Sequence, residues 1–219
     1  MIECNTAIAQ EGMHGDYGAN IGKVIAIRKD LPSLLKAYAA AGSDARMNGC
    51  ELPVVINSGS GNQGLTVSVP LIVYAEREHL DKEKLYRALV ISNLTAIHLK
   101  TEIGRLSAFC GAVSAGAACG AGLAYLKDAS EEVMNHTIVN ALAITSGIIC
   151  DGAKASCAAK IAVSVEAGIL GYDMYMNGQQ FYGGDGIISK GIENTIHNIG
   201  VLGSQGMAST DQEIIKNYV

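Results

Sequence analysis

LSAFCGAVSAGAACGAGLAYL, residues 106–126, runs for 21 residues without a charged side chain. A helix of that length could span a bilayer, and Gly116 and Gly120 form the GxxxG pattern of closely packed membrane helices. Alanine, glycine, serine and cysteine dominate the stretch, however, and such small side chains gain little free energy on entering lipid. The stretch therefore predicts a buried helix that its neighbours approach closely, rather than a membrane span.

The composition is that of a chain with an ample hydrophobic core. Its 219 residues are 49% hydrophobic, which is enough to build one domain. Only 5% are aromatic and 26 are glycine. Small and aliphatic side chains must therefore fill the core, and the backbones of neighbouring elements must approach each other closely. The net charge is −5 and no run of basic residues occurs, so we expect no nucleic-acid partner. Residues 1–219 are expected to form a single domain.

The start of the chain, MIECNTAIAQEG, lacks the basic and apolar segments of a signal peptide. We therefore expect a cytoplasmic protein without a membrane partner, and in such a chain a disulfide framework is not expected. The cysteines then either bind a metal or cluster as thiolates, or pack as buried, inert thiols. They are Cys4, Cys50, Cys110, Cys119, Cys150 and Cys157.

Helical patterns dominate the rest of the chain. Capping residues, amphipathic spacing and terminal glycines predict helices over residues 30–41, 81–101, 130–142, 155–170, 193–202 and 210–215. β-Branched residues indicate extended segments at 53–57 and 66–74, the second interrupted by Pro70, and residues 172–186 predict a glycine-rich loop or short hairpin. The expected fold is mainly α: a compact bundle of alanine- and glycine-rich helices with a glycine-rich loop and a few short extended segments.

The glycine-rich loop NSGSGNQG, residues 57–64, contains the spacing G-x-G-x-x-G. That spacing occurs in dinucleotide-binding folds, where a helix begins at the glycines. Residues 65–74 are rich in β-branched side chains and contain Pro70, so the context disfavours a nucleotide-binding module. Glycines also let backbone N–H groups converge on an anion. We therefore expect a carboxylate-binding loop or a structural turn, with the polar side chains Ser58, Ser60, Asn62 and Gln63.

Cys110, Cys150 and Cys157 lie in segments rich in glycine and alanine, and thiolates are the usual ligands of iron–sulfur clusters. On a continuous helix Cys110 and Cys119 would point to opposite faces. Cys150 and Cys157 would lie about 10.5 Å apart along an unbroken helix, too far for two ligands of one cluster. Asp151-Gly152 predicts a break between them, which would let both thiols reach one site.

Five motifs run through most of the chain: DARMNGC (44–50), NSGSGNQG (57–64), FCGAVSAGAACGAG (109–122), ICDGAKASCAAK (149–160) and GIENTIHNIGVLGSQGMASTDQEI (191–214). Together they resemble the iron–sulfur L-serine dehydratase α-chain family, most closely its L-cysteine desulfidase branch, from about residue 30 to the C-terminus. The resemblance implies a lyase that uses a [4Fe–4S] cluster and no pyridoxal phosphate. It also implies that Cys110, Cys150 and Cys157 are the cluster ligands.

The resemblance further implies the reaction. An iron that no cysteine holds acts as a Lewis acid on the β-hydroxyl or β-thiol of an amino acid, and elimination from L-serine or L-cysteine gives pyruvate and ammonia, plus sulfide from cysteine. Members of the branch are about twice this length, and this chain resembles their C-terminal half. We therefore expect a missing N-terminal half or partner subunit, without which the chain is inactive, and a homo-oligomer.

Two charged residues are further candidates for the site. Arg46 has a guanidinium that suits bidentate pairing with a substrate carboxylate, although an internal ion pair is an equal alternative. Lys154 is the candidate catalytic residue, since it would place positive charge beside an anionic cluster; a solvated lysine is its alternative. For the whole chain, the alternative function is a non-catalytic helical assembly or regulatory domain whose cysteines only pack.

Overall fold

The computed structural model describes residues 1–104 and 106–218. Within these residues the chain forms ten α-helices and one π-helix, and it contains no β-strand, only two isolated β-bridges. The predicted mainly α fold is therefore confirmed. The helices are α1 (Ile2–His14), α2 (Ile21–Ala26), α3 (Leu31–Met47), α4 (Gly61–Arg77), α5 (Lys82–Ile103), α6 (Gly111–Leu126), α7 (Glu131–Thr145), α8 (Cys157–Met176), α9 (Ile192–Val201), η1 (Leu202–Gly206) and α10 (Ala208–Tyr218).

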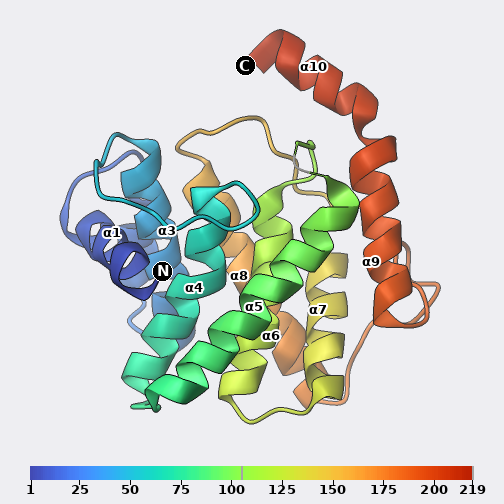
Figure 1. The fold of residues 1–219 in the computed structure, drawn as a ribbon, viewed down its shortest axis with the longest axis horizontal. Helices are drawn as coiled ribbons and strands as arrows, with labels where there is room; N and C mark the ends of the chain where they lie inside the picture. The colour runs from blue at the N-terminus through green and yellow to red at the C-terminus, as the bar shows by residue number, and fades with distance from the viewer. Residues whose placement is uncertain (105, 219) are drawn as a thin grey trace.

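α6 lies at the centre of the bundle, where it packs against α4, α5, α7 and α8 (Figure 1). All residues from Ala112 to Ala124 are buried, which confirms the buried helix predicted for this stretch. The helix begins at Gly111 rather than at Leu106, because Cys110 has an extended backbone conformation. None of the helices in the described part of the chain is long and apolar enough to cross a membrane.

Glycines allow α6 and α8 to approach each other within backbone contact. A Cβ atom at Gly116 would lie 2.3 Å from the carbonyl oxygen of Ser164, and one at Gly120 would lie 2.8 Å from Cα of Gly168. Any side chain at these positions would force the two helices apart. The GxxxG pattern of the sequence therefore serves helix packing inside this bundle.

The extended segment expected at 66–74 is wrong, because these residues belong to α4. All residues from Gly64 to Val73 are buried. A fully buried apolar run shows no periodicity that distinguishes a strand from a helix. Pro70 lies inside the helix, where it removes one backbone hydrogen bond. The hydroxyl groups of Thr66 and Ser68 donate to the carbonyl oxygens of Asn62 and Gly64 within the same helix.

Other boundaries also differ from the expectation. Residues 53–57 form no strand; Asn57 only makes an isolated bridge with Ser60. Gly171 does not end α8, which continues to Met176. It is a glycine because a Cβ atom there would lie 2.8 Å from the carbonyl oxygen of Thr137 on α7. α10 begins at Ala208, so the predicted capping box at 210–213 does not form, and α1 and α2 were not predicted.

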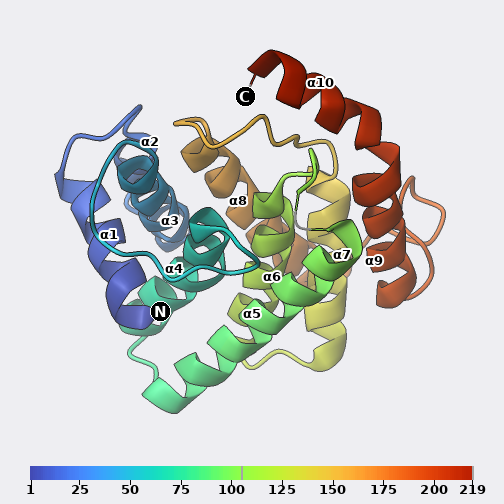
Figure 2. The same cartoon turned by 45° about the horizontal axis from the view of Figure 1, so that its top comes forward.

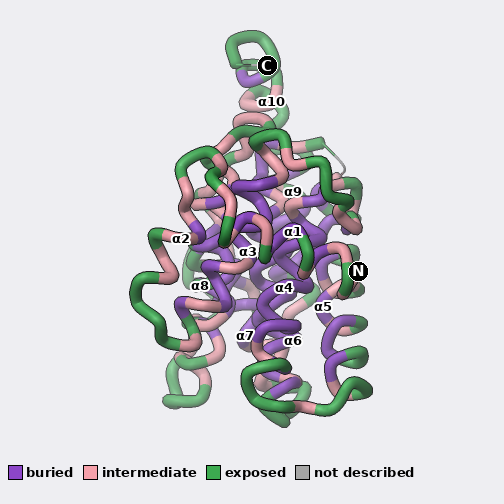
Figure 3. Tube along the Cα trace, turned by 90° about the vertical axis from the view of Figure 1, so that its left-hand side faces the viewer, coloured by how far each residue is buried: buried purple, intermediate pink, exposed green. Residues whose placement is uncertain are grey.

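The segments that precede α4, α6 and α8 lie at one end of the bundle (Figures 1 and 2). Buried residues are concentrated in the helices, whereas the connecting segments and α10 are largely exposed (Figure 3). The fold thus brings the glycine-rich loop, the start of α6 and the segment around residue 150 together at a partly exposed end of the core.

Candidate functional site

The N-terminal ends of three helices meet at one cavity of about 230 Å³. α4 begins at Gly61, α6 at Gly111 and α8 at Cys157, and residues of the first turn of all three helices contribute to its lining. The first turn of each helix carries partial positive charge on N–H groups that have no partner within the helix. The cavity therefore favours a negatively charged ligand.

This cavity unites most of the side chains that the sequence indicates. The glycine-rich loop and the three candidate cluster cysteines are far apart in the chain, but both line it. The predicted site residues that face the cavity are Ser58, Ser60, Asn62, Gln63, Cys110, Cys150 and Cys157. Arg46 and Lys154 are not part of its lining, and Cys119 is fully buried in α6.

Backbone hydrogen bonds hold the segments of Cys110 and Cys150 side by side. The N–H of Cys110 donates to the carbonyl oxygen of Ile148 at 3.3 Å, and the N–H of Cys150 donates to that of Ala108 at 2.6 Å. Cys157 is the first residue of α8, and its thiol lies 3.7 Å from the carbonyl oxygen of Gly152. The chain is not helical between Cys150 and Cys157, as the sequence predicted.

The two neighbouring thiols differ in acidity. The pKa of Cys150 is lowered to about 6, chiefly by a hydrogen bond from Cys110, with smaller contributions from the backbone N–H of Gly152 and the charge of Lys160. The same hydrogen bond, together with burial, raises the pKa of Cys110. The pair therefore favours a thiolate at Cys150, with the Cys110 thiol as hydrogen-bond donor, and the thiolate is the form that binds metal.

Two lysines supply positive charge to the cavity. Lys100, near the end of α5, is 6% exposed, and burial lowers its pKa. The structure shows no ion pair for it within the described residues. Burial disfavours the charged form of Lys160, but the hydrogen bond to Asp151 and the negative charge of Asp151 and the nearby thiols together outweigh it and raise its pKa. Lys154 instead points away, with its ammonium 3.3 Å from the carbonyl oxygen of Tyr218.

The glycine-rich loop makes a tight turn at the edge of the cavity. Asn57 and Ser60 exchange backbone hydrogen bonds of 3.1 and 3.0 Å, and Ser58 and Gly59 between them have φ of 48° and 82°. Positive φ at both central positions is typical of a type I′ turn. Asn57 anchors the turn, since its amide donates to the side chain of Asn93 on α5 at 2.9 Å. Ser60 caps α4 through the N–H of Gln63.

Two amides behind the turn are oriented differently. The amide oxygen of Asn62 accepts hydrogen bonds from Ser43 at 3.1 Å and from Arg46 at 3.2 Å. Arg46 therefore contacts the cavity lining through Asn62 rather than facing the cavity itself. The amide oxygen of Gln63 is buried and has no hydrogen-bond partner among the described residues. A Cβ atom at Gly111 would lie 2.6 Å from the Gln63 amide nitrogen, so the glycine leaves space for this side chain.

The donor set suits an iron–sulfur cluster in its chemistry. Three thiols line one cavity beside two lysines, and thiolates are the ligands that such clusters take from proteins. In their present rotamers, no group of three or more His, Cys, Asp or Glu side chains among the described residues is arranged to hold a single metal ion. Cys157 lies at a helix start next to an irregular segment and lines the same cavity as Cys110 and Cys150.

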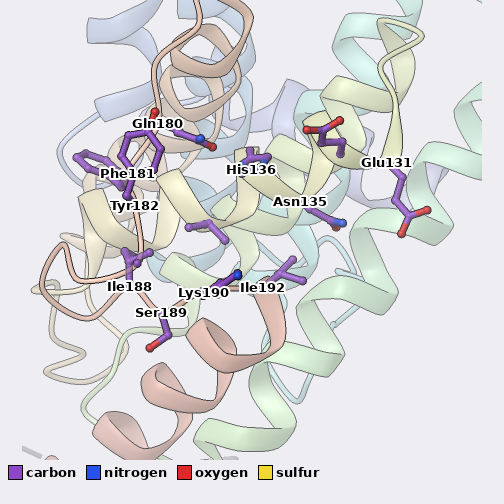
Figure 4. Close-up of a pocket in the computed structure, with 14 residues that line it drawn as sticks. Glu131, Asn135, His136, Gln180, Phe181, Tyr182, Ile188, Ser189, Lys190 and Ile192 are labelled. Carbon is purple, nitrogen blue, oxygen red and sulfur yellow. The ribbon is translucent and has the colours of Figure 1, made fainter.

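A larger cavity, of about 630 Å³, lies between α7 and residues 180–192 (Figure 4). Its lining includes Glu131, His136, Phe181 and Lys190 but no cysteine. The ring of His136 stacks on Tyr175, with 4.3 Å between the ring centroids. The candidate cysteines and the glycine-rich loop are absent from this cavity, and we therefore assign the candidate site to the cysteine cavity.

Lys100 and Lys160 were not predicted as cavity residues from the sequence, although the position of each on its helix could have indicated them. Lys100 lies on the same helical face as Leu85, Leu89 and Ala96, which is the buried face of α5. A lysine at such a position is buried and therefore a candidate for a site. Lys160 follows Cys157 by one helical turn, so both side chains lie on the same face of α8.

Comparison with known proteins identifies relatives over the whole chain. A UPF0597 protein of Desulfitobacterium hafniense is 64% identical over 216 residues, which cover 98% of this chain and 50% of that protein. UPF0597 proteins of Lachnoclostridium phytofermentans and Finegoldia magna are 54% and 51% identical, and each is covered to 52%. The chain thus spans about half the length of these relatives. No solved structure matches the chain.

A family model confirms the relationship that the motifs indicate. The model that describes the serine dehydratase alpha chain matches residues 1–216. This range contains the turn before α4 and all the cysteines that line the cavity. The chain therefore belongs to the serine dehydratase alpha chain family.

Proposed function

We propose that this chain is the cluster-binding domain of a pyridoxal-phosphate-independent [4Fe–4S] lyase. The reaction is elimination of the β-substituent of L-serine or L-cysteine, which gives pyruvate and ammonia, plus sulfide from cysteine. One observation carries the proposal: Cys110, Cys150 and Cys157 line a single cavity together with the glycine-rich loop. Membership of the serine dehydratase alpha chain family supports the same reaction class.

In this proposal Cys110, Cys150 and Cys157 hold the cluster. When bound, the cluster supplies an iron that acts as a Lewis acid on the β-substituent. Lys100 and Lys160 offset the negative charge of the thiolates, and the N-terminal ends of α6 and α8 add to this effect. Lys154 contributes only at a distance, because its ammonium contacts Tyr218.

The turn before α4 binds the rest of the amino acid. The N-terminal end of α4 and the hydroxyl groups of Ser58 and Ser60 suit the substrate carboxylate. The amide oxygen of Gln63, which has no partner among the residues that the structure describes, accepts a hydrogen bond from the substrate ammonium. Arg46 keeps Asn62 in place through the hydrogen bond between their side chains. Fixing the two ends of the substrate in this way would orient its Cα–H and its β-substituent.

The whole protein extends beyond this chain in the proposal. Because the chain spans half of its relatives' length, we assign the proton-abstracting base to a second half or partner subunit. Exposed apolar residues on one face of α5 support such an interface: Tyr86, Val90, Leu94 and Ile97 are 45–61% exposed. This face leads toward the cavity, where Leu106 is 93% exposed. A homo-oligomer of the complete protein is part of the same proposal.

Anaerobic reconstitution with iron and sulfide tests cluster binding directly. The wild-type chain is expected to become brown, with bound iron and sulfide in equal amounts. Cys110→Ser, Cys150→Ser and Cys157→Ser should each lose most of the visible absorbance, whereas Cys119→Ser, the matched control within α6, should keep it. A wild-type chain that stays colourless under these conditions would favour the alternative of a helical assembly domain with packing cysteines.

A further inference from the structure

The C-terminal motif GSQGMASTD, residues 203–211, has no role in the site described so far. It forms the end of η1 and the first turn of α10. Asp211 lies in that first turn, and its carboxylate accepts a hydrogen bond from the backbone N–H of Ala108. The motif therefore contacts the segment that immediately precedes Cys110.

The peptide around Ala108 connects both neighbouring thiols. Its N–H donates to Asp211, and its carbonyl oxygen accepts the N–H of Cys150 at 2.6 Å. Two residues further on, the N–H of Cys110 donates to Ile148. The position of Ala108 thus determines where both the Cys110 and the Cys150 segments lie.

A second contact ties the same segment to η1. The hydroxyl of Ser107 donates to the carbonyl oxygen of Gly203 at 2.6 Å and accepts the N–H of Phe109 at 3.0 Å. Gly203 packs closely here, since a Cβ atom would lie 2.8 Å from Ile103 and 3.3 Å from Phe109. Residues 107–109 are therefore held at two points by the C-terminal part of the chain.

We propose that Asp211 is a positioning residue for the Cys110–Cys150 thiol pair. Its carboxylate fixes the peptide of Ala108, and this peptide sets the separation of the two sulfur atoms. A hydrogen bond to a charged acceptor is among the stronger ones in proteins, so one carboxylate can hold a segment that has no regular secondary structure. The importance of this pair for a cluster rests on the proposed function, but the geometry of the pair does not.

The test uses phenylarsine oxide, which binds two close thiols without any cluster. Its arsenic–oxygen bond is replaced by two arsenic–sulfur bonds, and the oxygen leaves as water with the two thiol protons, so no oxidant is needed. In a Cys4→Ser, Cys50→Ser, Cys157→Ser background, the pair and the buried Cys119 are the remaining thiols. Cys110→Ser in this background should abolish tight binding, which defines the signal.

Asp211→Ala is expected to weaken phenylarsine oxide binding about tenfold, the usual scale for losing a hydrogen bond to a charged group. Asp211→Asn keeps an acceptor oxygen while removing the charge, so its affinity should lie between that of the background and that of Asp211→Ala. Glu213→Ala is the control on the same helix, because Glu213 is exposed and its carboxylate bonds only Asn217 among the described residues. Circular dichroism verifies that each variant keeps its helices.

Three outcomes would overturn the proposal. Asp211→Ala could bind the arsenical as tightly as the background, or Glu213→Ala could weaken binding equally. Asp211→Asn could behave like Asp211→Ala, which would assign the effect to charge, since Asp211 also acts electrostatically on Lys100. If the arsenical results agree with the proposal and reconstitution fails, the positioning role stands and the cluster assignment falls.

Discussion

Cys110 and Cys119 belong to the same motif, yet the fold gives them opposite surroundings. Cys119 lies in the body of α6, fully buried, and burial raises the pKa of its thiol. Cys110 lies just before the first turn of α6, beside Cys150 and the cavity. The body of the helix packs against its neighbours through small side chains. Its N-terminal end has partial positive charge and lies next to polar side chains. One helix thus serves both the core and the candidate site.

The largest expected effect tests packing in the body of α6. Gly116→Ala places a Cβ atom against the carbonyl oxygen of Ser164 on α8, 2.3 Å away. We expect a loss of about 3 kcal/mol in the free energy of unfolding, because the new methyl group meets the backbone of α8 and the two helices can separate only by losing packing contacts. Urea denaturation measures it. Gly147→Ala is the matched control, since a Cβ atom there meets nothing within 4 Å. Equal stability of the two variants would contradict close packing of α6 on α8.

Serine replacements of Cys119 and Cys110 compare directly how much each thiol contributes to stability. Cys119→Ser buries a hydroxyl in an apolar site, and we expect it to lower the free energy of unfolding by about 1–2 kcal/mol. Cys110→Ser should cost less than about 1 kcal/mol in the cluster-free chain, because the hydroxyl can donate to Cys150 as the thiol does. Urea denaturation of both variants gives the answer, and a reversed order would show that the core and cavity assignments are wrong.

Lys100 gives the cavity end a pH dependence that the core lacks. Burial lowers its pKa, so the unfolded chain binds more protons than the folded chain between the folded and unfolded pKa values. The free energy of unfolding therefore rises with pH across that interval. Lys100→Met removes this contribution, so the variant should be more stable than wild type at neutral pH, by no more than about 2 kcal/mol.

This stability difference should shrink as the pH approaches the ordinary lysine pKa of 10.5. Urea denaturation of both proteins at several pH values provides this difference curve. Lys216→Met, an exposed replacement on α10, should give a flat curve. A flat curve for Lys100→Met as well would mean that Lys100 is hydrated rather than buried.

The smallest expected effect is a difference in reaction rate. Because the pKa of Cys150 is lowered to about 6, its alkylation by iodoacetamide in the cluster-free chain should rise through pH 6 and level off by about pH 8. Cys119 should stay unmodified in the folded chain. Mass spectrometry of the two peptides follows both residues, and a Cys150 midpoint near that of an ordinary thiol would contradict its pairing with Cys110.

The helices whose sequences carry local signals could be predicted from the chain alone. Asp30, Asp81 and Ser130 each accept the backbone N–H three residues later, as their capping role requires. Amphipathic spacing follows these caps, so the local preference and the tertiary contacts agree. α4 has no such agreement, since its β-branched residues and Pro70 favour other structures. Burial on all sides stabilises it as a helix nevertheless.

The sequence by itself determined a mainly α fold, a buried helix within residues 106–126, the break between Cys150 and Cys157, and membership of a family through long motifs. These features depend on spacing along the chain. Only the tertiary structure placed the glycine-rich loop beside the cysteines and connected Asp211 to Ala108. It also showed that Lys100 and Lys160 line the cavity, whereas the predicted Lys154 does not. The physical reason is that such contacts join segments far apart in sequence, where packing of whole helices, rather than local preference, sets which side chains meet.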